Sequence, residues 1–177
     1  MRNNQPITGQ KHHIRADAAF ITHTDAKGRI TWANDEFVEA SGFTREELVG
    51  QSHNIVRHPD MPSEAFRDLW ATLKRGRPWT GLVKNRRKNG DHYWVRANVS
   101  PSAEGYTSVR AKPTRQDVDA AEALYRNMRN DPGIRLDGGF VVPSGLTGRR
   151  HRLFGRLKIA HRLWSMVGLS ALLFVAA

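Results

Sequence analysis

The sequence predicts an α+β fold: a five-stranded antiparallel sheet with short helices on one face. Two observations lead to this prediction. Strand-like and helix-like segments are grouped along the chain, in the order two strands, three helices and three strands. The pair Asn89-Gly90 is a tight-turn signal between two of the late strands, as in an antiparallel hairpin. The concave side of such a sheet, covered by the helices, is the natural place for a ligand cavity.

The amino-terminal segment is predicted to be an arm followed by a hairpin. Residues 1–16 are polar and basic, which is typical of a flexible arm. Apolar and β-branched residues form strand-like runs at 19–24 and 30–33, and the turn-forming residues 25–28 separate them.

Three helices are expected next. Asn34 can cap the first, which Gly42 ends, and Thr44 and Glu47 have the spacing of a capping box for the second. The third helix, residues 62–74, begins at a proline. Its single apolar stripe consists of Ala65, Phe66, Leu69, Trp70 and Leu73, and this stripe must face an apolar surface.

Three strands, at 79–86, 91–100 and 106–112, complete the predicted sheet. A helix over residues 114–130 follows, with Thr114 as its cap. Its apolar residues have the spacing of a packing seam: Val118, Ala121, Tyr125 and Met128. The seam can face the domain's own sheet or a helix of a partner chain.

One folded domain, residues 17–113, is expected, because 177 residues leave room for one core of ordinary size plus appendages. After the connecting helix 114–130, residues 131–162 are interpreted as a linker and a basic juxtamembrane stretch. Residues 163–177 contain no charged residue. We interpret them as the start of a transmembrane helix cut short by the end of the sequence, because a crossing needs about 20 apolar residues. The alternative is a C-terminal helix buried in a soluble core.

The formal charge of +11 is unevenly distributed. Six basic residues and no acidic one lie between Gly138 and the end of the chain. Basic residues before a hydrophobic span mark its cytoplasmic side, so we expect a cytoplasmic domain and no nucleic-acid partner. The absence of cysteine excludes disulfides, thiolate metal sites and cysteinyl adducts to a cofactor.

Two segments resemble the PAS domain of bacterial aerotaxis receptors, FAD-containing redox sensors anchored to the inner membrane. They are ITWANDEFVEASGFTREELVGQSHNIVRHPDMP and VKNRRKNGDHYWVRAN, and the helix with Trp70 lies between them. The resemblance covers nearly the whole chain. It implies a PAS fold over residues 17–113, FAD as cofactor, and a redox or oxygen (energy) sensor that signals through flavin redox-dependent rearrangement of the PAS domain.

The resemblance also implies partners and a location. In a full-length receptor, the output reaches a HAMP and signalling region that controls a histidine kinase, and the sensor domain is cytoplasmic and anchored to the bacterial inner membrane. We expect a homodimer as well. No Ser-His-Asp or paired-carboxylate arrangement stands out, so we expect no enzymatic activity and no metal site.

A flavin site explains several residues. An isoalloxazine ring needs aromatic walls and a few polar groups at its pyrimidine end. Phe66 and Trp70 can form the aromatic walls of such a site. Asn85 lies on the same strand face as Val83 and Gly81, and the resemblance places it where an asparagine meets the pyrimidine. Alternatively, Asn85 only closes the turn that follows it.

A second group of candidate site residues precedes the third helix. Arg57, His58 and Asp60 lie in a polar segment broken by proline, and a guanidinium can bind a phosphate or a ring carbonyl with forked geometry. The resemblance implicates this cluster in FAD binding, with His53 and Asn54 close enough to contribute. The alternative is a solvated loop in which Asp60 caps the helix.

The chain also departs from light-sensing flavin PAS domains. Those domains have a reactive cysteine at the position of Ile55, so a photoadduct is impossible here. They have a second asparagine where this chain has Val95, so one hydrogen bond to the ring is missing or replaced. Three alternatives to a flavin sensor stay open: a haem-binding PAS domain with His53 or His58 as axial ligand, a cofactor-free, membrane-anchored module that dimerises, and, ranked last, nucleic-acid binding through the basic tail.

Overall fold

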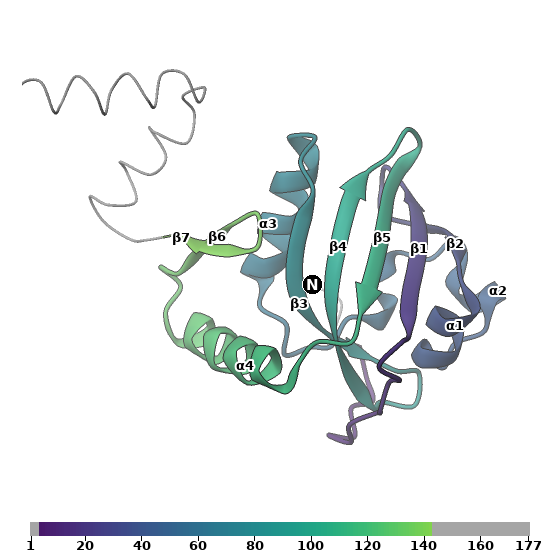
Figure 1. Cartoon of the computed structure of the whole chain (residues 1–177), viewed down its shortest axis with the longest axis horizontal. Coiled ribbons are helices and arrows are strands. Elements are labelled where there is room, and N and C mark those ends of the chain that lie inside the picture. The colour runs from purple at the N-terminus through teal and green to yellow at the C-terminus, as the bar shows by residue number, and fades with distance from the viewer. Residues whose placement is uncertain (1–3, 143–177) are drawn as a thin grey trace, which may run out of the picture. The chain divides into compact units, whose positions relative to one another are not determined.

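The computed structural model describes residues 4–142 of the 177-residue chain. These residues form a five-stranded sheet, helices around it and a two-stranded hairpin (Figure 1). The elements in chain order are β1 (Ala19–Asp25), β2 (Ile30–Ala33), α1 (Asp35–Ser41), α2 (Arg45–Leu48), the 3₁₀ helix η1 (His53–Val56), α3 (Ser63–Lys74), β3 (Trp79–Arg86), β4 (His92–Pro101), β5 (Gly105–Ala111), α4 (Arg115–Asn130), β6 (Arg135–Asp137) and β7 (Phe140–Val142).

The large sheet is antiparallel with the order β2-β1-β5-β4-β3, which confirms the predicted fold. β1 and β5 pair along their full length, from Ala19 opposite Ala111 to Asp25 opposite Gly105. This pairing joins the amino-terminal hairpin to the three later strands. A side chain at Gly105 would collide with the backbone of Thr24 and Asp25, so the end of the pairing depends on a glycine.

The short helices α1 and α2 begin where the sequence predicts. The Asn34 side chain accepts a hydrogen bond from the Phe37 N–H, and Gly42 ends α1 with a φ of 71°. Thr44 and Glu47 form the capping box of α2. Each cap contributes about 1 kcal/mol to helix stability. Both helices pack on one face of the sheet, around a core that includes Phe20, Ile30, Phe37, Leu48, Tyr93 and Val95.

The amino-terminal residues run along the sheet, which differs from the flexible arm predicted for residues 1–16. The His12 N–H donates to the His92 oxygen over 2.7 Å, and the His92 N–H donates to the Gln10 oxygen over 2.9 Å. The side chain of Asn4 donates to the backbone oxygen of Arg57 over 3.0 Å. Each of these bonds has a main-chain donor or acceptor. Because every residue carries these groups, the amino-acid composition of the segment does not predict the bonds.

The apolar stripe of α4 packs on the domain's own sheet. Tyr125 stacks on Trp94 with 6.1 Å between ring centroids, and its hydroxyl donates to the Leu82 oxygen over 2.5 Å. Trp94 alternates along β4 with Tyr93 and Val95, so α4 covers the sheet face opposite the core under α1 and α2.

Strands β6 and β7 form a hairpin inside the segment predicted to be a linker. Its turn consists of Gly138 and Gly139, with φ values of 65° and 93°, as a two-residue hairpin turn requires. Leu136 on β6 is buried in the same apolar cluster as α4. The hairpin lies beside α3 (Figure 1). The glycines that indicated a linker therefore belong to a folded turn.

The C-terminal predictions fall outside the described residues. These are the basic stretch up to residue 162 and the start of a transmembrane helix at 163–177. Within residues 4–142, no helix is long and apolar enough to cross a membrane.

Replacing Tyr125 tests the packing of α4. Tyr125→Ala should lower the free energy of unfolding by about 3–5 kcal/mol, because it removes a buried aromatic side chain. Tyr125→Phe should cost about 1 kcal/mol, because only the hydrogen bond to Leu82 is lost. Urea unfolding measures both values. If the stripe served a partner chain instead, Tyr125→Ala would dissociate a dimer and leave the stability of the monomer unchanged.

Candidate ligand-binding site

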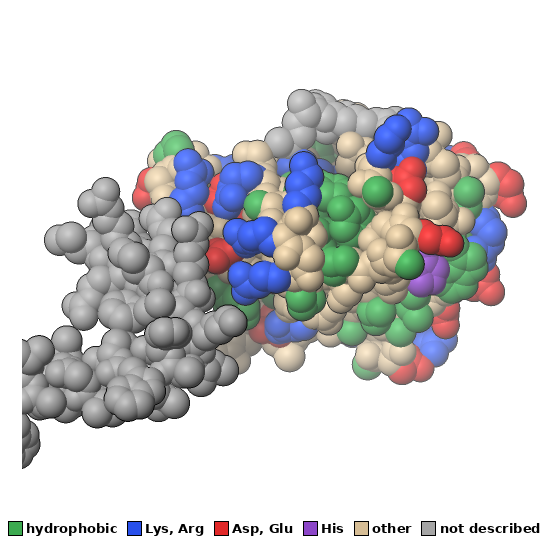
Figure 2. Space-filling model, turned by 90° about the horizontal axis from the view of Figure 1, so that it is seen from above, with side chains coloured by type: hydrophobic (Ala, Val, Ile, Leu, Met, Phe, Trp, Pro, Cys, Tyr) green, Lys and Arg blue, Asp and Glu red, His purple; other side chains and the backbone are tan. Residues whose placement is uncertain are grey.

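A cavity of about 190 Å³ lies between the sheet on one side and α3 and η1 on the other. It is larger than the cavity of roughly 150 Å³ that holds a benzene ring, so an aromatic ring can enter it. Four aromatic side chains line it: Phe66, Trp70, Trp79 and Tyr106. Seen from above, the surface shows a hydrophobic area bordered on one side by lysine and arginine side chains (Figure 2).

Six of the eight candidate residues line this cavity: His53, Asn54, Arg57, Phe66, Trp70 and Asn85. His58 and Asp60 do not. The Asp60 carboxylate accepts a hydrogen bond from Lys84 Nζ over 2.7 Å, and Lys84 alternates with Asn85 on β3, so it faces away from the cavity. His58 Nδ1 accepts from the Asp60 backbone N–H over 3.1 Å. Burial and then the charge of Lys84 lower the pKa of His58 to about 4, so its ring is neutral near pH 7.

Asn85 offers a hydrogen-bond donor to the cavity. Its side chain is 3% exposed, and its Nδ2 makes no hydrogen bond of good geometry among the described residues. The side chain also interacts with the buried hydroxyl of Tyr93, which lies opposite it on β4. Ser108 on β5 also lines the cavity, and its buried Oγ likewise lacks a partner within residues 4–142. An unpaired buried polar group costs about 1–3 kcal/mol. A ligand with hydrogen-bonding groups would remove this cost at both positions.

Arg110 is a cavity residue that the sequence analysis missed. Its guanidinium lies 2.7 Å from His53 Nε2 and 3.1 Å from Thr22 Oγ1. A guanidinium can only donate, so Nε2 accepts, and the neutral imidazole keeps its proton on Nδ1. Burial and then the charge of Arg110 hold the pKa of His53 well below its usual value. Burial also lowers the pKa of Arg110 to about 10, which leaves it charged at pH 7.

Arg57 supplies a second buried positive charge. One of its nitrogens donates to the Met61 oxygen over 2.8 Å, and its guanidinium lies 3.8 Å from the centre of the Phe66 ring. Burial lowers the pKa of Arg57. No aspartate or glutamate lines the cavity in the described part of the chain. The cavity therefore has a positive potential and favours a ligand with negative charge.

Trp70 closes one end of the cavity against the β1–β2 turn. Its ring meets Tyr106 edge to face, with 5.5 Å between centroids. On the other side it lies against Gly28, where a Cβ would come within 2.7 Å of the indole. Gly28 also has a φ of 76°, which disfavours any other residue. The position of Trp70 therefore depends on a glycine in the opposite hairpin.

Comparisons with known proteins identify the domain that contains this cavity. Residues 30–110 match the family described as PAS fold. The chain is also 43% identical to the aerotaxis receptor of Escherichia coli K12 over 99% of its own length. Residues 30–110 form a PAS domain. The resemblance inferred from the sequence is thereby confirmed.

Other proteins are similar to part of the chain. The nitrogen fixation regulatory protein of Klebsiella pneumoniae is 27% identical over 62% of this chain and 22% of its own length. The solved PAS domain of a protein from Colwellia psychrerythraea matches 55% of this chain and 87% of that chain, with 20% identity and a TM-score of 0.49. The present chain spans 34% of the length of the aerotaxis receptor.

Val95 contributes to the core of this PAS domain and has no polar group to offer. It pairs with Val83 across the β3–β4 ladder and is fully buried. The unpaired polar atoms that line the cavity come instead from Asn85 and Ser108. Alternation along β5 could have indicated Ser108 and Arg110, because both face inward beside the more exposed Val109.

A methyl group at Gly28 should displace Trp70. Gly28→Ala and Gly50→Ala both place a side chain at a φ near 80°, but the space around Gly50 is open. We expect Gly28→Ala to lower the free energy of unfolding by about 1–3 kcal/mol more than Gly50→Ala, because it forces an overpacked contact. Urea unfolding and near-ultraviolet circular dichroism measure the difference. Equal losses in the two variants would show that Trp70 does not rest on Gly28.

The stability of the PAS domain should fall as the pH drops below about 6.5. His53 stays neutral in the folded state because its pKa is lowered, whereas in the unfolded chain it takes up a proton near pH 6.5. The unfolded state then binds more protons, so acid favours unfolding. His53 contributes a slope of at most about 1.4 kcal/mol per pH unit. Urea unfolding at pH 7, 6 and 5 measures the slope. His53→Gln should make the slope shallower, and an unchanged slope would show that His53 is not its cause.

Proposed function

We propose that this PAS domain binds FAD non-covalently and senses redox state or oxygen through it. One observation carries the proposal. A cavity with aromatic walls is lined by the polar side chains of Asn85 and Ser108, whose Nδ2 and Oγ make no hydrogen bond of good geometry within the described residues. A flat ring with an apolar end and a hydrogen-bonding end matches this arrangement. The resemblance to FAD-containing aerotaxis receptors supports the choice of ligand.

Each group of cavity residues would hold a different part of FAD. Phe66 and Trp70 would contact the apolar part of the ring system, and Asn85 and Ser108 would bond to its polar edge. Arg57 would bind a ring carbonyl or a phosphate. We propose that His58 and Asp60 act indirectly, because they fix the segment that carries Arg57. When bound, FAD supplies reversible uptake of electrons.

Arg110 is suited to respond to a change of charge in the cavity. Its guanidinium attracts added negative charge, and no acidic side chain among the cavity residues of the described chain competes for it. The same guanidinium holds His53 on η1 and Thr22 on β1. A shift of Arg110 toward the ligand would therefore alter bonds to two elements at once.

The wider role follows from the relative. We propose that the chain is the sensor part of a receptor resembling the aerotaxis receptor of Escherichia coli, without enzymatic activity of its own. We further propose a homodimer, a cytoplasmic sensor domain anchored to the bacterial inner membrane, and a HAMP and signalling region that controls a histidine kinase. The uncharged segment 163–177 and the basic residues before it support the anchor.

The alternatives fit the cavity less well. A haem would need a free axial nitrogen, but Nε2 of His53 is bound to Arg110, and His58 does not line the cavity. A cofactor-free module would leave the buried Ser108 hydroxyl without a hydrogen-bond partner within the described residues. Both alternatives predict a protein without a flavin spectrum.

The visible spectrum of the complete purified chain in detergent tests the proposal. We expect a flavin spectrum and FAD released on denaturation. A folded, colourless chain that takes up no added FAD would refute the flavin site.

Two substitutions locate the site. Trp70→Ala and Asn85→Ala should lower the flavin content about tenfold or more, because each removes a direct contact, worth roughly 1.5 kcal/mol or above. Asn98→Ala is the matched control, because Asn98 is exposed on β4 and bonds to Thr80. Parent-level flavin in the Asn85 variant would show that the site lies elsewhere.

A further inference from the structure

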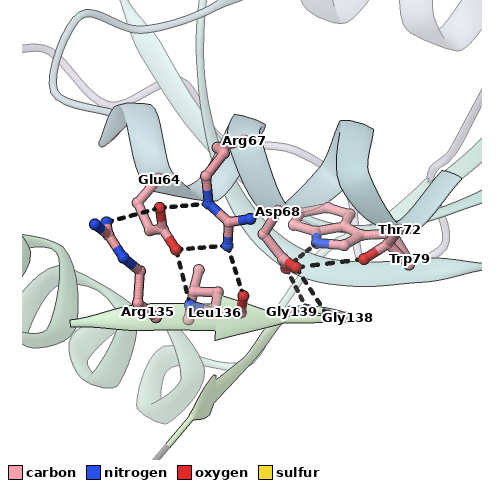
Figure 3. Close-up of polar contacts among 9 residues, drawn as sticks. All are labelled: Glu64, Arg67, Asp68, Thr72, Trp79, Arg135, Leu136, Gly138 and Gly139. Atoms are coloured by element: carbon pink, nitrogen blue, oxygen red, sulfur yellow. Dashed lines mark hydrogen bonds and ion pairs between the residues drawn. The ribbon is translucent and has the colours of Figure 1, made fainter. Parts of the chain in front are cut away.

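Asp68 on α3 is a buried carboxylate with four hydrogen-bond donors. It is 1% exposed. One oxygen accepts from Trp79 Nε1 over 2.8 Å and from the Gly139 N–H over 2.7 Å, and the other accepts from the Gly138 N–H over 2.9 Å and from Thr72 Oγ1 over 3.3 Å (Figure 3). A carboxylate has about four acceptor positions, so this one is fully used.

The donors to Asp68 belong to two distant parts of the domain. Trp79 is a wall of the cavity, whereas Gly138 and Gly139 form the turn of the β6–β7 hairpin. The Trp79 ring lies against Gly81, where any Cβ would collide with it. A Cβ at Gly139 would collide with the Thr80 oxygen, so the turn is also held against the start of β3.

Glu64 provides a second attachment for the hairpin, one helical turn before Asp68. Its carboxylate pairs with Arg67 at 2.7 Å and accepts from the Leu136 N–H over 2.9 Å (Figure 3). Residues four apart share one face of a helix. The face with Glu64 and Asp68 therefore holds the hairpin, while Phe66, Leu69, Trp70 and Leu73 of the same helix line the cavity. Helix α3 lies between the two.

We propose that Asp68 is a positioning residue that couples the ligand in the cavity to the docking of the β6–β7 hairpin. The identity of the ligand rests on the function proposed above. A ligand that moves the Trp79 indole must change its bond to Asp68, and the same carboxylate holds the hairpin turn. Coupling of this kind is reciprocal, so docking of the hairpin in turn favours the ligand. The chain continues from this hairpin to residues 143–177.

The first test compares Asp68→Asn with the parent in the complete, ¹⁵N-labelled chain without ligand. Asparagine keeps the shape of the aspartate side chain but has only one acceptor oxygen. Its NH₂ group would face hydrogen-bond donors instead of accepting from them. We expect amide exchange at Gly138 and Gly139 to become about tenfold faster and the Trp79 indole signal, assigned with Trp79→Phe, to shift. Asp137→Asn is the control: it removes an exposed ion pair of the same hairpin with Arg75 and should leave the indole signal in place.

The second test adds FAD. In the parent, saturating FAD and its reduction with dithionite should change the exchange of Gly138 and Gly139, and Asp68→Asn should bind FAD about tenfold more weakly, within the usual range of coupling between sites. Trp79→Phe keeps an aromatic ring but lacks the indole N–H. In this variant the amide exchange of Gly138 and Gly139 should no longer change when saturating FAD is added or reduced.

Each outcome decides the proposal. A faster hairpin exchange in Asp68→Asn without a shift of the Trp79 signal, or a Trp79→Phe variant whose hairpin still responds to FAD, would overturn the coupling. If Asp68→Asn does not fold, the Trp79→Phe comparison decides alone. A parent chain that binds no FAD refutes the proposed function, and the ligand-free comparison still shows whether Asp68 links the cavity wall to the hairpin.

Discussion

The antiparallel pairing of β1 with β5 is the constraint on which the cavity depends. It places Thr22 opposite Ser108 and Phe20 opposite Arg110, although these residues lie near opposite ends of the domain's sequence. Only in this register does the Arg110 guanidinium reach Thr22 and, beyond it, His53 on η1. A shift by one residue would turn every inward side chain of one strand outward. The polar end of the cavity is thus a product of strand register.

Burial of two arginines without a carboxylate is costly, and the domain offsets the cost locally. Arg110 bonds to a neutral histidine and a hydroxyl, and it lies 5.4 Å from the centre of the Phe37 ring. Arg57 bonds to a backbone oxygen and packs on Phe66. None of these partners removes the positive charge, as a carboxylate would. The charge remains available to whatever enters the cavity, which is the property expected of a site for an acidic cofactor.

Local patterns in the sequence were sufficient for much of this PAS domain. Helix caps at Asn34 and Thr44, the apolar stripe of α3 and the inward position of Asn85 each depend on residues a few positions apart, and all could be predicted. Alternation along β5 could have placed Arg110 inward, but its bonds to Thr22 and His53 could not be predicted, because they depend on the β1–β5 register. The β6–β7 hairpin was missed for a related reason: Gly138 and Gly139 suit its turn, but its docking depends on Glu64 and Asp68, about 70 residues earlier.

The first described residues of the chain support the wall of the cavity from outside. The Asn4 amide donates to the backbone oxygens of Asn54 and Arg57, at 2.6 and 3.0 Å, and the Arg86 guanidinium donates to the backbone oxygen of Pro6. These bonds fix the 3₁₀ helix that presents His53 and Asn54. Loss of Asn4 or Pro6 would therefore loosen the segment that carries His53 and Asn54, although neither of the two residues lines the cavity itself.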